Sequence, residues 1–210
     1  MRVFLARHGE TEWNAEHRLQ GRSNTRLTPR GEAHARALAE LLRDEPLDAI
    51  FTSTLGRTIA TAEPLATARG ITAEARPELV ELSYGVLEGR TAEDSDPEFV
   101  RLWAERKRDP LRFRAPGGET YAELAVRVGR FVDEIRGRFP DGSLLVVGHR
   151  ATNRTLLALL LGMPLEESLR FKHKHETVLE IRPGMDPACI EHRYAPVAHA
   201  AHRQAEKGDL

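Results

Sequence analysis

The sequence is poor in cysteine and has no long hydrophobic run. Cys189 is the one cysteine among its 210 residues, which excludes an internal disulfide framework and fits a reducing compartment. No apolar run approaches the roughly 20 residues that cross a bilayer, and residues 156–161 are far too short. The N-terminal residues hold too few apolar side chains for a signal peptide. These absences predict a cytoplasmic protein without a membrane partner.

An excess of charge of either sign is also missing. The chain has 31 Lys and Arg against 32 Asp and Glu, and this balance excludes a globally basic nucleic-acid binder. It lacks a Gly-x-x-x-x-Gly-Lys loop, so P-loop chemistry is not supported. The pairs His173/His175 and His199/His202 join no carboxylate or cysteine cluster at zinc-like spacing. We therefore expect no metal and no cofactor.

The chain does have the material for one globular domain. Hydrophobic residues make up 40% and charged residues 30% of the sequence, which is enough apolar material for a core. A length of 210 residues fits one domain. We expect that domain to cover residues 1–195, with residues 196–210, which are small, polar and charged, as a flexible tail.

Short apolar runs alternate with helical patterns along the chain. Thr28 is an expected N-cap before Pro29, and Ser53 is expected to cap a helix that runs to Arg69 and stops at Gly70. This alternation predicts an α/β domain with a mostly parallel central sheet. The predicted strands are residues 3–6, 48–52 and 144–147, with an edge hairpin at 175–181 and 188–194, and further helices are predicted at 118–139 and 151–161.

Polar clusters follow three of the predicted strands. They lie at residues 7–10, 53–57 and 148–150, and they contain two histidines and several arginines. Because ligands of open α/β sheets bind at the carboxyl ends of the strands, we expect these clusters to meet at one rim. A neutral imidazole is a nucleophile, and guanidinium groups stabilise the charge of a phosphoryl group in transfer. The pattern therefore indicates phosphoryl chemistry.

Five segments, in the same order, resemble the histidine phosphatase superfamily, which includes cofactor-dependent phosphoglycerate mutase. The resemblance covers residues 1 to about 160. It rests on Arg7-His8-Gly9-Glu10-Thr11-Glu12-Trp13-Asn14, Gln20-Gly21 with Leu27-Thr28 and Gly31, residues 53–62, Leu79-Val80-Glu81-Leu82 with Gly85 and Glu88-Gly89, and Val146-Val147-Gly148-His149. It implies a three-layer α/β/α fold like that of phosphoglycerate mutase, with a small helical cap at roughly residues 91–115.

The resemblance also implies residue roles. His8 would be the nucleophile that forms a phosphohistidine, and Glu81 would protonate the leaving alkoxide and then activate water. Four other carboxylates compete with Glu81 for that role, namely Glu10, Glu12, Glu78 and Glu88. Phosphoryl oxygens would be held by Arg7, Arg57 and His149, with Asn14, Gln20 and Gly21 as further binding residues.

Arg150 departs from the family pattern, because phosphoglycerate mutases typically continue with Gly-Asn-Ser after the second histidine. Its side chain either reaches the pocket rim and meets a second anionic group on the substrate, or points away and pairs with Glu78 or Glu81. Both interpretations stay open from the sequence.

Mutases of this family carry a long insertion after the acidic segment, and here only 37 residues separate Glu81 from Glu119. Both departures favour a metal-independent phosphatase of small phosphate monoesters, closest to the broad-specificity branch. The alternatives are a cofactor-dependent phosphoglycerate mutase and a catalytically silent protein that binds phosphoryl ligands. The expected partner is a small phosphorylated metabolite, and a homodimer is an open alternative.

Overall fold

The computed structural model describes residues 1–187 and 190–194. The predicted tail at 196–210 lies outside the described residues. Within them the chain forms a six-stranded sheet in the order β3-β2-β4-β1-β5-β6. The strands are β1 (Arg2–Arg7), β2 (Ala49–Ser53), β3 (Glu74–Arg76), β4 (Ser143–Gly148), β5 (Thr177–Ile181) and β6 (Glu191–Tyr194). The first four run parallel, and β5 and β6 form an antiparallel hairpin at one edge, which confirms the predicted sheet.

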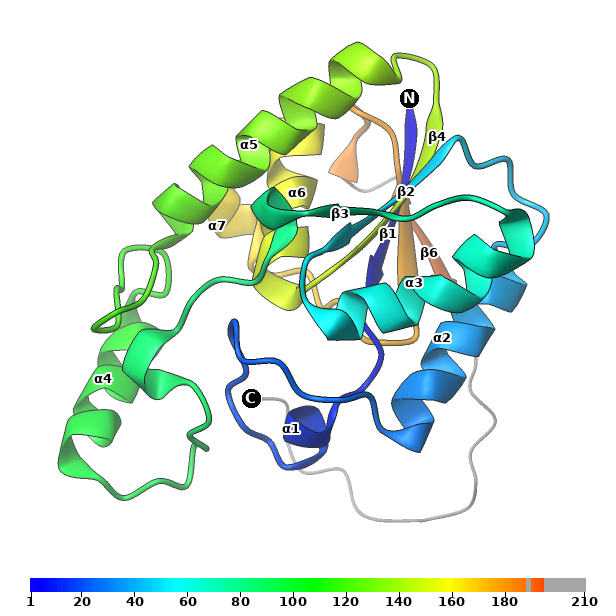
Figure 1. Ribbon diagram of the computed structural model, residues 1–210. Helices are drawn as coiled ribbons and strands as arrows, with labels where there is room; N and C mark the ends of the chain where they lie inside the picture. The colour runs from blue at the N-terminus through cyan, green and yellow to red at the C-terminus, as the bar shows by residue number, and fades with distance from the viewer. Residues whose placement is uncertain (188–189, 195–210) are drawn as a thin grey trace.

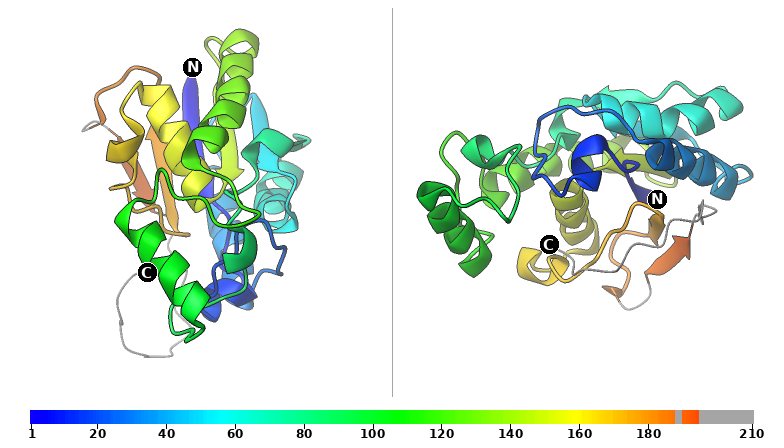
Figure 2. Two further views of the ribbon diagram at one scale, coloured as in Figure 1. Left: turned by 90° about the vertical axis from the view of Figure 1, so that its left-hand side faces the viewer. Right: turned by 90° about the horizontal axis from the view of Figure 1, so that it is seen from below.

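Helices cover both faces of this sheet (Figures 1 and 2). The helices are α1 (Glu12–Ala15), α2 (Pro29–Leu41), α3 (Gly56–Arg69), α4 (Pro97–Arg108), α5 (Tyr121–Arg138), α6 (Arg150–Leu161) and α7 (Leu165–Ser168), with short 3-10 turns at Pro77–Leu79 and Gly85–Leu87. The α5, α6 and α7 helices lie on one face, and α2 and α3 lie on the other. The predicted three-layer α/β/α arrangement is confirmed.

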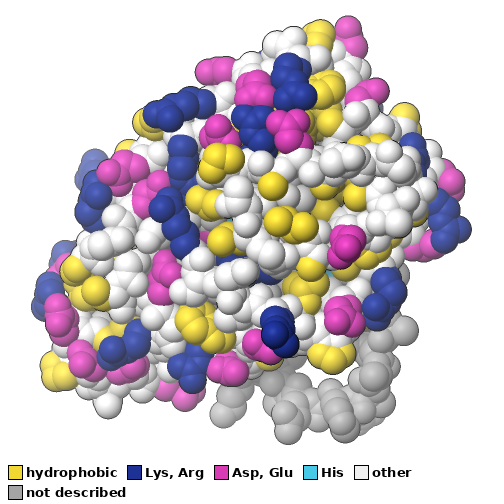
Figure 3. All heavy atoms as spheres, viewed as in Figure 1, with side chains coloured by type: hydrophobic (Ala, Val, Ile, Leu, Met, Phe, Trp, Pro, Cys, Tyr) yellow, Lys and Arg dark blue, Asp and Glu magenta, His cyan; other side chains and the backbone are white. Residues whose placement is uncertain are grey.

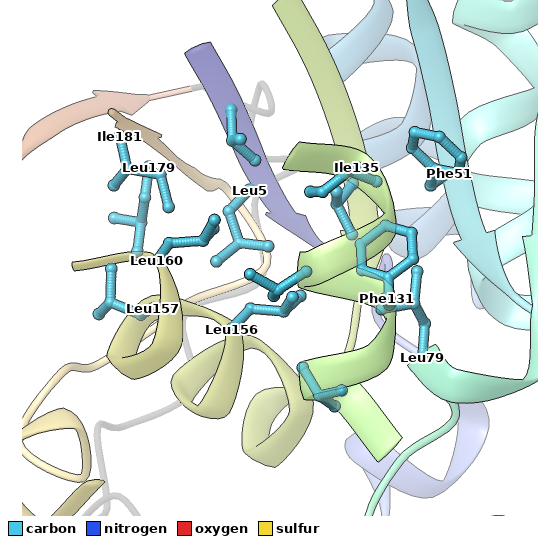
Figure 4. Close-up of a cluster of buried hydrophobic side chains, with 14 of the residues drawn as sticks. Leu5, Phe51, Leu79, Phe131, Ile135, Leu156, Leu157, Leu160, Leu179 and Ile181 are labelled. Atoms are coloured by element: carbon cyan, nitrogen blue, oxygen red, sulfur yellow. The ribbon is translucent and has the colours of Figure 1, made fainter. Parts of the chain in front are cut away.

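Alternation along β1 builds the two halves of the core. Val3 and Leu5 point to the α5/α6 face, whereas Phe4 and Ala6 point to the α2/α3 face, because successive side chains of a strand project on opposite sides. Figure 4 shows the first of these cores, in which Leu5 lies among leucines of α6 and β5. These four side chains are almost fully buried. The strand is therefore fixed from both sides, and its carboxyl end has a defined position.

Local capping residues set most helix boundaries. Thr28 accepts a hydrogen bond from the Gly31 N–H at 3.0 Å, as predicted. Thr120 and Glu123 form a capping box, so α5 begins at Tyr121 rather than at residue 118. Gly70 and Gly162 end α3 and α6 in the left-handed conformation.

The prediction for Ser53 was wrong. This residue ends β2, and the N-cap of α3 is Leu55, which has no side-chain capping bond. The Ser53 hydroxyl still accepts a hydrogen bond from the Leu55 N–H at 3.1 Å. The same hydroxyl also lies 2.8 Å from Thr58 Oγ1 and 2.7 Å from a buried histidine described below.

The predicted cap segment, residues 91–115, contains α4, which stands beside the three layers at the carboxyl end of the sheet (Figures 1 and 2). It has a small core of its own around Leu87, Phe99 and Leu102. Figure 3 shows acidic and basic side chains mixed over one face of the molecule. None of the helices in the described ranges is long and apolar enough to cross a membrane.

Candidate active site

The carboxyl ends of β1, β2 and β4 bring the predicted polar clusters together. Arg7 pairs with Gly148 at the end of the parallel β1–β4 ladder, so His8 and His149 leave adjacent strands side by side. Their ring centroids lie 5.2 Å apart. Both side chains are buried. The structure therefore places the two histidines at one rim, as expected from the sequence.

The His8 ring is held in one tautomer. Its Nδ1 lies 2.8 Å from the Gly9 carbonyl oxygen, and a carbonyl can only accept, so Nδ1 carries the proton and Nε2 keeps its lone pair. Burial, together with the nearby His149, Arg57 and Arg7, lowers the pKa of His8 well below its ordinary value. A neutral imidazole with a free Nε2 is a competent nucleophile.

The backbone around His8 is fixed on three sides. Its N–H donates to the Gly148 carbonyl at 3.0 Å, and its own carbonyl accepts from His175 Nδ1 at 2.6 Å. Gly9 follows in very close contact with α2, where an added Cβ would lie 2.3 Å from the Gly31 carbonyl oxygen. The Gly9 position therefore requires glycine, because any side chain would push the loop that follows His8 off α2.

His149 is engaged at both ring nitrogens. Arg57 Nε donates to its Nδ1 at 3.2 Å, so the neutral ring carries its proton on Nε2, which donates to Ser53 Oγ at 2.7 Å. Burial, followed by Arg57 and Arg7, lowers the pKa of His149 well below its ordinary value. In this arrangement His149 orients Arg57. Donation from Nδ1 to a phosphoryl oxygen requires the ring to take up a second proton.

Arg57 is the largest fully buried side chain of the site, with 2% of its surface exposed. Its Nη1 donates to the Ser23 carbonyl at 2.7 Å and its Nη2 to the Gly21 carbonyl at 2.6 Å. Burial lowers its pKa to about 10, so it is a cation at neutral pH. Arg57 thus ties the loop around residues 20–23 to His149.

That loop is held from its other side by Glu88. Its carboxylate accepts from the N–H groups of Arg22 and Ser23 at 3.1 and 3.0 Å, and from that of Tyr84 at 3.0 Å. Gly21 has a φ of +53°, and an added Cβ would lie 2.1 Å from Glu88 Oε1. Glu88 is therefore a clamp for the loop that holds Arg57.

Gln20 and Asn14 line the same cavity. Both amides also stabilise their own loop: Gln20 donates to Thr25 Oγ1 at 2.5 Å, and Asn14 Oδ1 accepts from the Thr11 N–H at 3.1 Å. Thr11 also donates to both amide oxygens through its hydroxyl. The oxygen of each amide is thus used within the loop.

Arg7 carries an unsatisfied donor. Its Nε is buried and has no hydrogen-bond partner among the described residues, and its Nη1 lies 3.4 Å from the His173 carbonyl. Burial first, and then the nearby Arg150, lowers the Arg7 pKa to about 10. Buried donors in native structures are nearly always satisfied, so this guanidinium is suited to an anionic ligand in the cavity.

Glu81 lies at the N-terminus of α6. Its oxygens accept from the N–H groups of Ala151 and Thr152, both at 3.2 Å, and from the Leu82 N–H at 2.9 Å. These three bonds fix the position of the Glu81 side chain beside the start of α6. Glu81 lines the cavity, whereas the four competing carboxylates, Glu10, Glu12, Glu78 and Glu88, do not.

The cavity has a volume of about 610 Å³ and is strongly basic. The sequence-predicted residues His8, Arg7, Arg57, Glu81, Asn14, Gln20, Gly21 and Arg150 all line it, and His149 lies directly behind His8 and Arg57. Arg150 therefore reaches the rim, the first of its two predicted positions.

Several cavity residues were missed by the sequence reasoning. They include Tyr84, Arg106, Tyr121, Arg154 and His175. Arg154 carried a usable signal, since it lies four residues after Arg150 on a predicted helix and so shares its face. The others reach the cavity only through the packing of distant segments.

Three buried histidines make stability depend on pH. The pKa values of His8, His149 and His175 are all lowered well below the ordinary value, chiefly by burial. Below about pH 6.5 the unfolded chain binds protons that the folded chain does not. The free energy of unfolding should therefore fall as pH falls from 7.5 to 5.5, by up to about 1.4 kcal/mol per pH unit for each histidine.

Denaturant unfolding at pH 7.5, 6.5 and 5.5 measures this dependence. A His175→Gln variant, which keeps a donor near the His8 carbonyl, should show a shallower slope than the parent chain. Equal stability of the parent at pH 7.5 and 5.5, or an unchanged slope in the variant, contradicts the prediction.

Comparison with known proteins adds independent findings. The sequence pattern of the histidine phosphatase superfamily (branch 1) matches residues 3–192. A protein of Yersinia enterocolitica named probable phosphoglycerate mutase GpmB is 39% identical over 176 residues, which are 82% of this chain and 81% of that protein.

Solved structures are similar over nearly the whole chain. The α-ribazole phosphatase from Shigella flexneri has a TM-score of 0.82 at 28% identity, over 97% of this chain and 100% of that one. A mycobacterial glucosyl-3-phosphoglycerate phosphatase complexed with VO3 has a TM-score of 0.74 at 26% identity, over 92% and 97% of the two chains.

Proposed function

The chain is an enzyme of the histidine phosphatase superfamily, and we propose that it hydrolyses small phosphate monoesters without a metal, through a phosphohistidine on His8. The observation that carries this proposal is the His8 tautomer: Nδ1 donates to Gly9, and Nε2 is left free in a basic cavity. Phosphate-monoester hydrolysis is among the slowest uncatalysed reactions, so a covalent relay and strong charge stabilisation are both needed.

In the first step, His8 Nε2 attacks phosphorus and the bond to the leaving oxygen breaks. Arg7 and Arg57 bind the phosphoryl oxygens, and Glu81 donates a proton to the departing alkoxide. His149 holds Arg57 in place. Each preorganised donor of this kind typically contributes about 10²- to 10³-fold to turnover.

In the second step, Glu81 takes a proton from a water molecule, which attacks phosphorus as the P–N bond breaks. Inorganic phosphate leaves, and His8 returns to its neutral state. The lowered pKa of His8 suits this cycle, because the free enzyme must present an unprotonated nitrogen.

The second candidate function is phosphoglycerate mutation, favoured by the name of the 39% identical relative. Hydrolysis is favoured by the phosphatase names of the similar structures and by a cap whose helix, α4, has 12 residues. A silent binding protein is disfavoured, because all the matched catalytic residues are retained and lie together. The proposed substrate is a small phosphorylated metabolite of the cytoplasm. The homodimer stays a prediction.

Phosphate release is expected to exceed any interconversion of 3- and 2-phosphoglycerate. A mutase must shield its phosphoenzyme from water until the phosphoryl group returns to substrate, and a short cap shields it poorly. Both products are measured on one preparation, with and without EDTA and added 2,3-bisphosphoglycerate. Hydrolysis should not require added 2,3-bisphosphoglycerate, and EDTA should not inhibit it. Interconversion that outruns phosphate release by a wide margin would establish the mutase instead.

A further inference from the structure

Four residues form a wall between the active-site cavity and a second cavity. Tyr84, Arg106, Tyr121 and Arg154 line both the 610 Å³ cavity and a neighbouring one of about 210 Å³. Arg154 comes from α6, one turn after Arg150, and Arg106 comes from the cap helix α4. The wall therefore joins α6, the helix that follows His149, to the segment that covers the site.

The two wall arginines lack acidic partners. Arg106 lies over the rings of Tyr84 and Trp103, 5.0 and 4.8 Å from their centroids, and Arg154 Nε donates to the Phe171 carbonyl at 3.0 Å. Neither has a carboxylate within 4 Å in the part of the chain that the structure describes. Both are half-buried. No carboxylate of the described residues therefore neutralises their positive charge at the cavity.

Two other arginines of the same cavity are paired with carboxylates. Arg18 lies 2.6 Å from Glu16, and Arg90 lies 2.6 Å from Asp94. In these two pairs a carboxylate of the chain itself neutralises the arginine. Arg106 and Arg154 therefore differ from Arg18 and Arg90, and resemble Arg7 and Arg57, in having no carboxylate partner among the described residues.

The surroundings of the wall favour an anion. Burial and the nearby Arg154 and Arg106 lower the pKa of Arg150, so the three guanidinium groups repel one another. Burial raises the pKa values of Tyr84 and Tyr121, and both phenols stay protonated as potential donors. An anion between these groups would relieve the repulsion and receive several charge-assisted hydrogen bonds.

We propose that Arg106 and Arg154 bind a second anionic group of the substrate, a carboxylate or a second phosphate. Arg154 follows His149 by five residues, which is about 7.5 Å along a helix axis. The substrate class is therefore a small phosphate monoester whose second anionic group lies a few bonds from the ester oxygen. This inference rests on the proposed hydrolysis at His8.

Two matched substrate pairs test the subsite. The first is 3-phosphoglycerate against glycerol 3-phosphate, in which CH2OH replaces the carboxylate. The second is fructose 1,6-bisphosphate against fructose 6-phosphate. The quantity measured is the ratio of kcat/KM within each pair, from phosphate release by the wild type, Arg106→Gln, Arg154→Gln and Arg154→Lys.

The wild type should prefer the substrate with the second anionic group in at least one pair. A preference in the first pair identifies that group as a carboxylate, and a preference in the second pair identifies it as a phosphate. Each glutamine variant should reduce that ratio by about ten- to a hundred-fold, the usual range for a hydrogen bond to a charged group. Arg154→Lys should recover part of the preference, because it keeps the charge. If Arg154→Lys recovers none of the preference, the effect of Arg154 is assigned to its bond with the Phe171 carbonyl and not to its charge.

Arg101→Gln is the matched control, since Arg101 lies on α4 with Arg106 but is exposed and pairs with Glu105. It should leave the ratio unchanged. A ratio unchanged in both glutamine variants, or a wild type without any preference, overturns the subsite alone. Absence of phosphate release from all four compounds by the wild type instead overturns the proposed function. If Arg154→Gln does not fold, Arg106→Gln decides the test.

Discussion

His8→Ala is expected to reduce phosphate release by about 10⁴-fold or more, because removal of a nucleophile eliminates the covalent route. The fold should persist. The His8 ring donates a single hydrogen bond, to Gly9, while the backbone of His8 stays paired to Gly148 and His175. The substitution thus removes chemistry and little of the core.

Rapid acid quench with a 32P-labelled substrate gives the direct measurement. The wild type should carry an acid-labile label on the peptide that contains His8, and His8→Ala should carry none. His17→Asn is a suitable control, because His17 also lines the cavity but has no role in the proposed mechanism. A label on another residue, or near-normal turnover by the alanine variant, would remove His8 from its role.

Arg57→Met should lower kcat/KM by at least about 10²- to 10³-fold. The methionine removes the cation and, with it, the bonds that hold Gly21, Ser23 and His149. Loss of charge stabilisation and loss of loop position then act in the same direction. Competitive inhibition by inorganic phosphate should weaken in parallel, because the same guanidinium binds the product.

Arg57→Lys separates these two contributions. A lysine keeps the charge but cannot reach three acceptors in one plane, so it should recover only a small part of the activity. Arg69→Met is the control on the same helix, since Arg69 lies at the far end of α3 and bonds to the carbonyls of Arg43 and Glu45. Activity of Arg57→Met within threefold of wild type would contradict the assignment.

The sequence was sufficient for the core of the site because strand ends are local signals. His8 and His149 each follow a short apolar run, and the parallel pairing of β1 with β4 brings them together. The error at Ser53 has a physical cause. A serine before a helical pattern is a normal cap, but here its hydroxyl accepts a bond from His149, a residue 96 positions away.

The outer wall of the cavity could not be predicted in the same way. Tyr84 lies outside any recurring pattern. Tyr121 belongs to the buried face of α5, so its spacing predicts core and not a cavity wall. Arg106 enters the cavity because α4 packs through Phe99 and Leu102 onto its own small core. Arg154 could be placed on the face of Arg150 but not against Arg106. Such positions depend on how distant segments pack, and no local spacing encodes that.

The position of β1 has a consequence for biosynthesis. This strand is made before the other strands of the sheet, yet its two neighbours are β4, at residues 143–148, and β5, at residues 177–181. During translation the apolar residues of β1 must therefore wait, unpaired, until most of the chain has left the ribosome. Pairing across such long separations is slow and exposes strand edges to other chains. His8, which follows β1, is thus synthesised before most of the site and reaches its working environment only after β4 and β5 have been made.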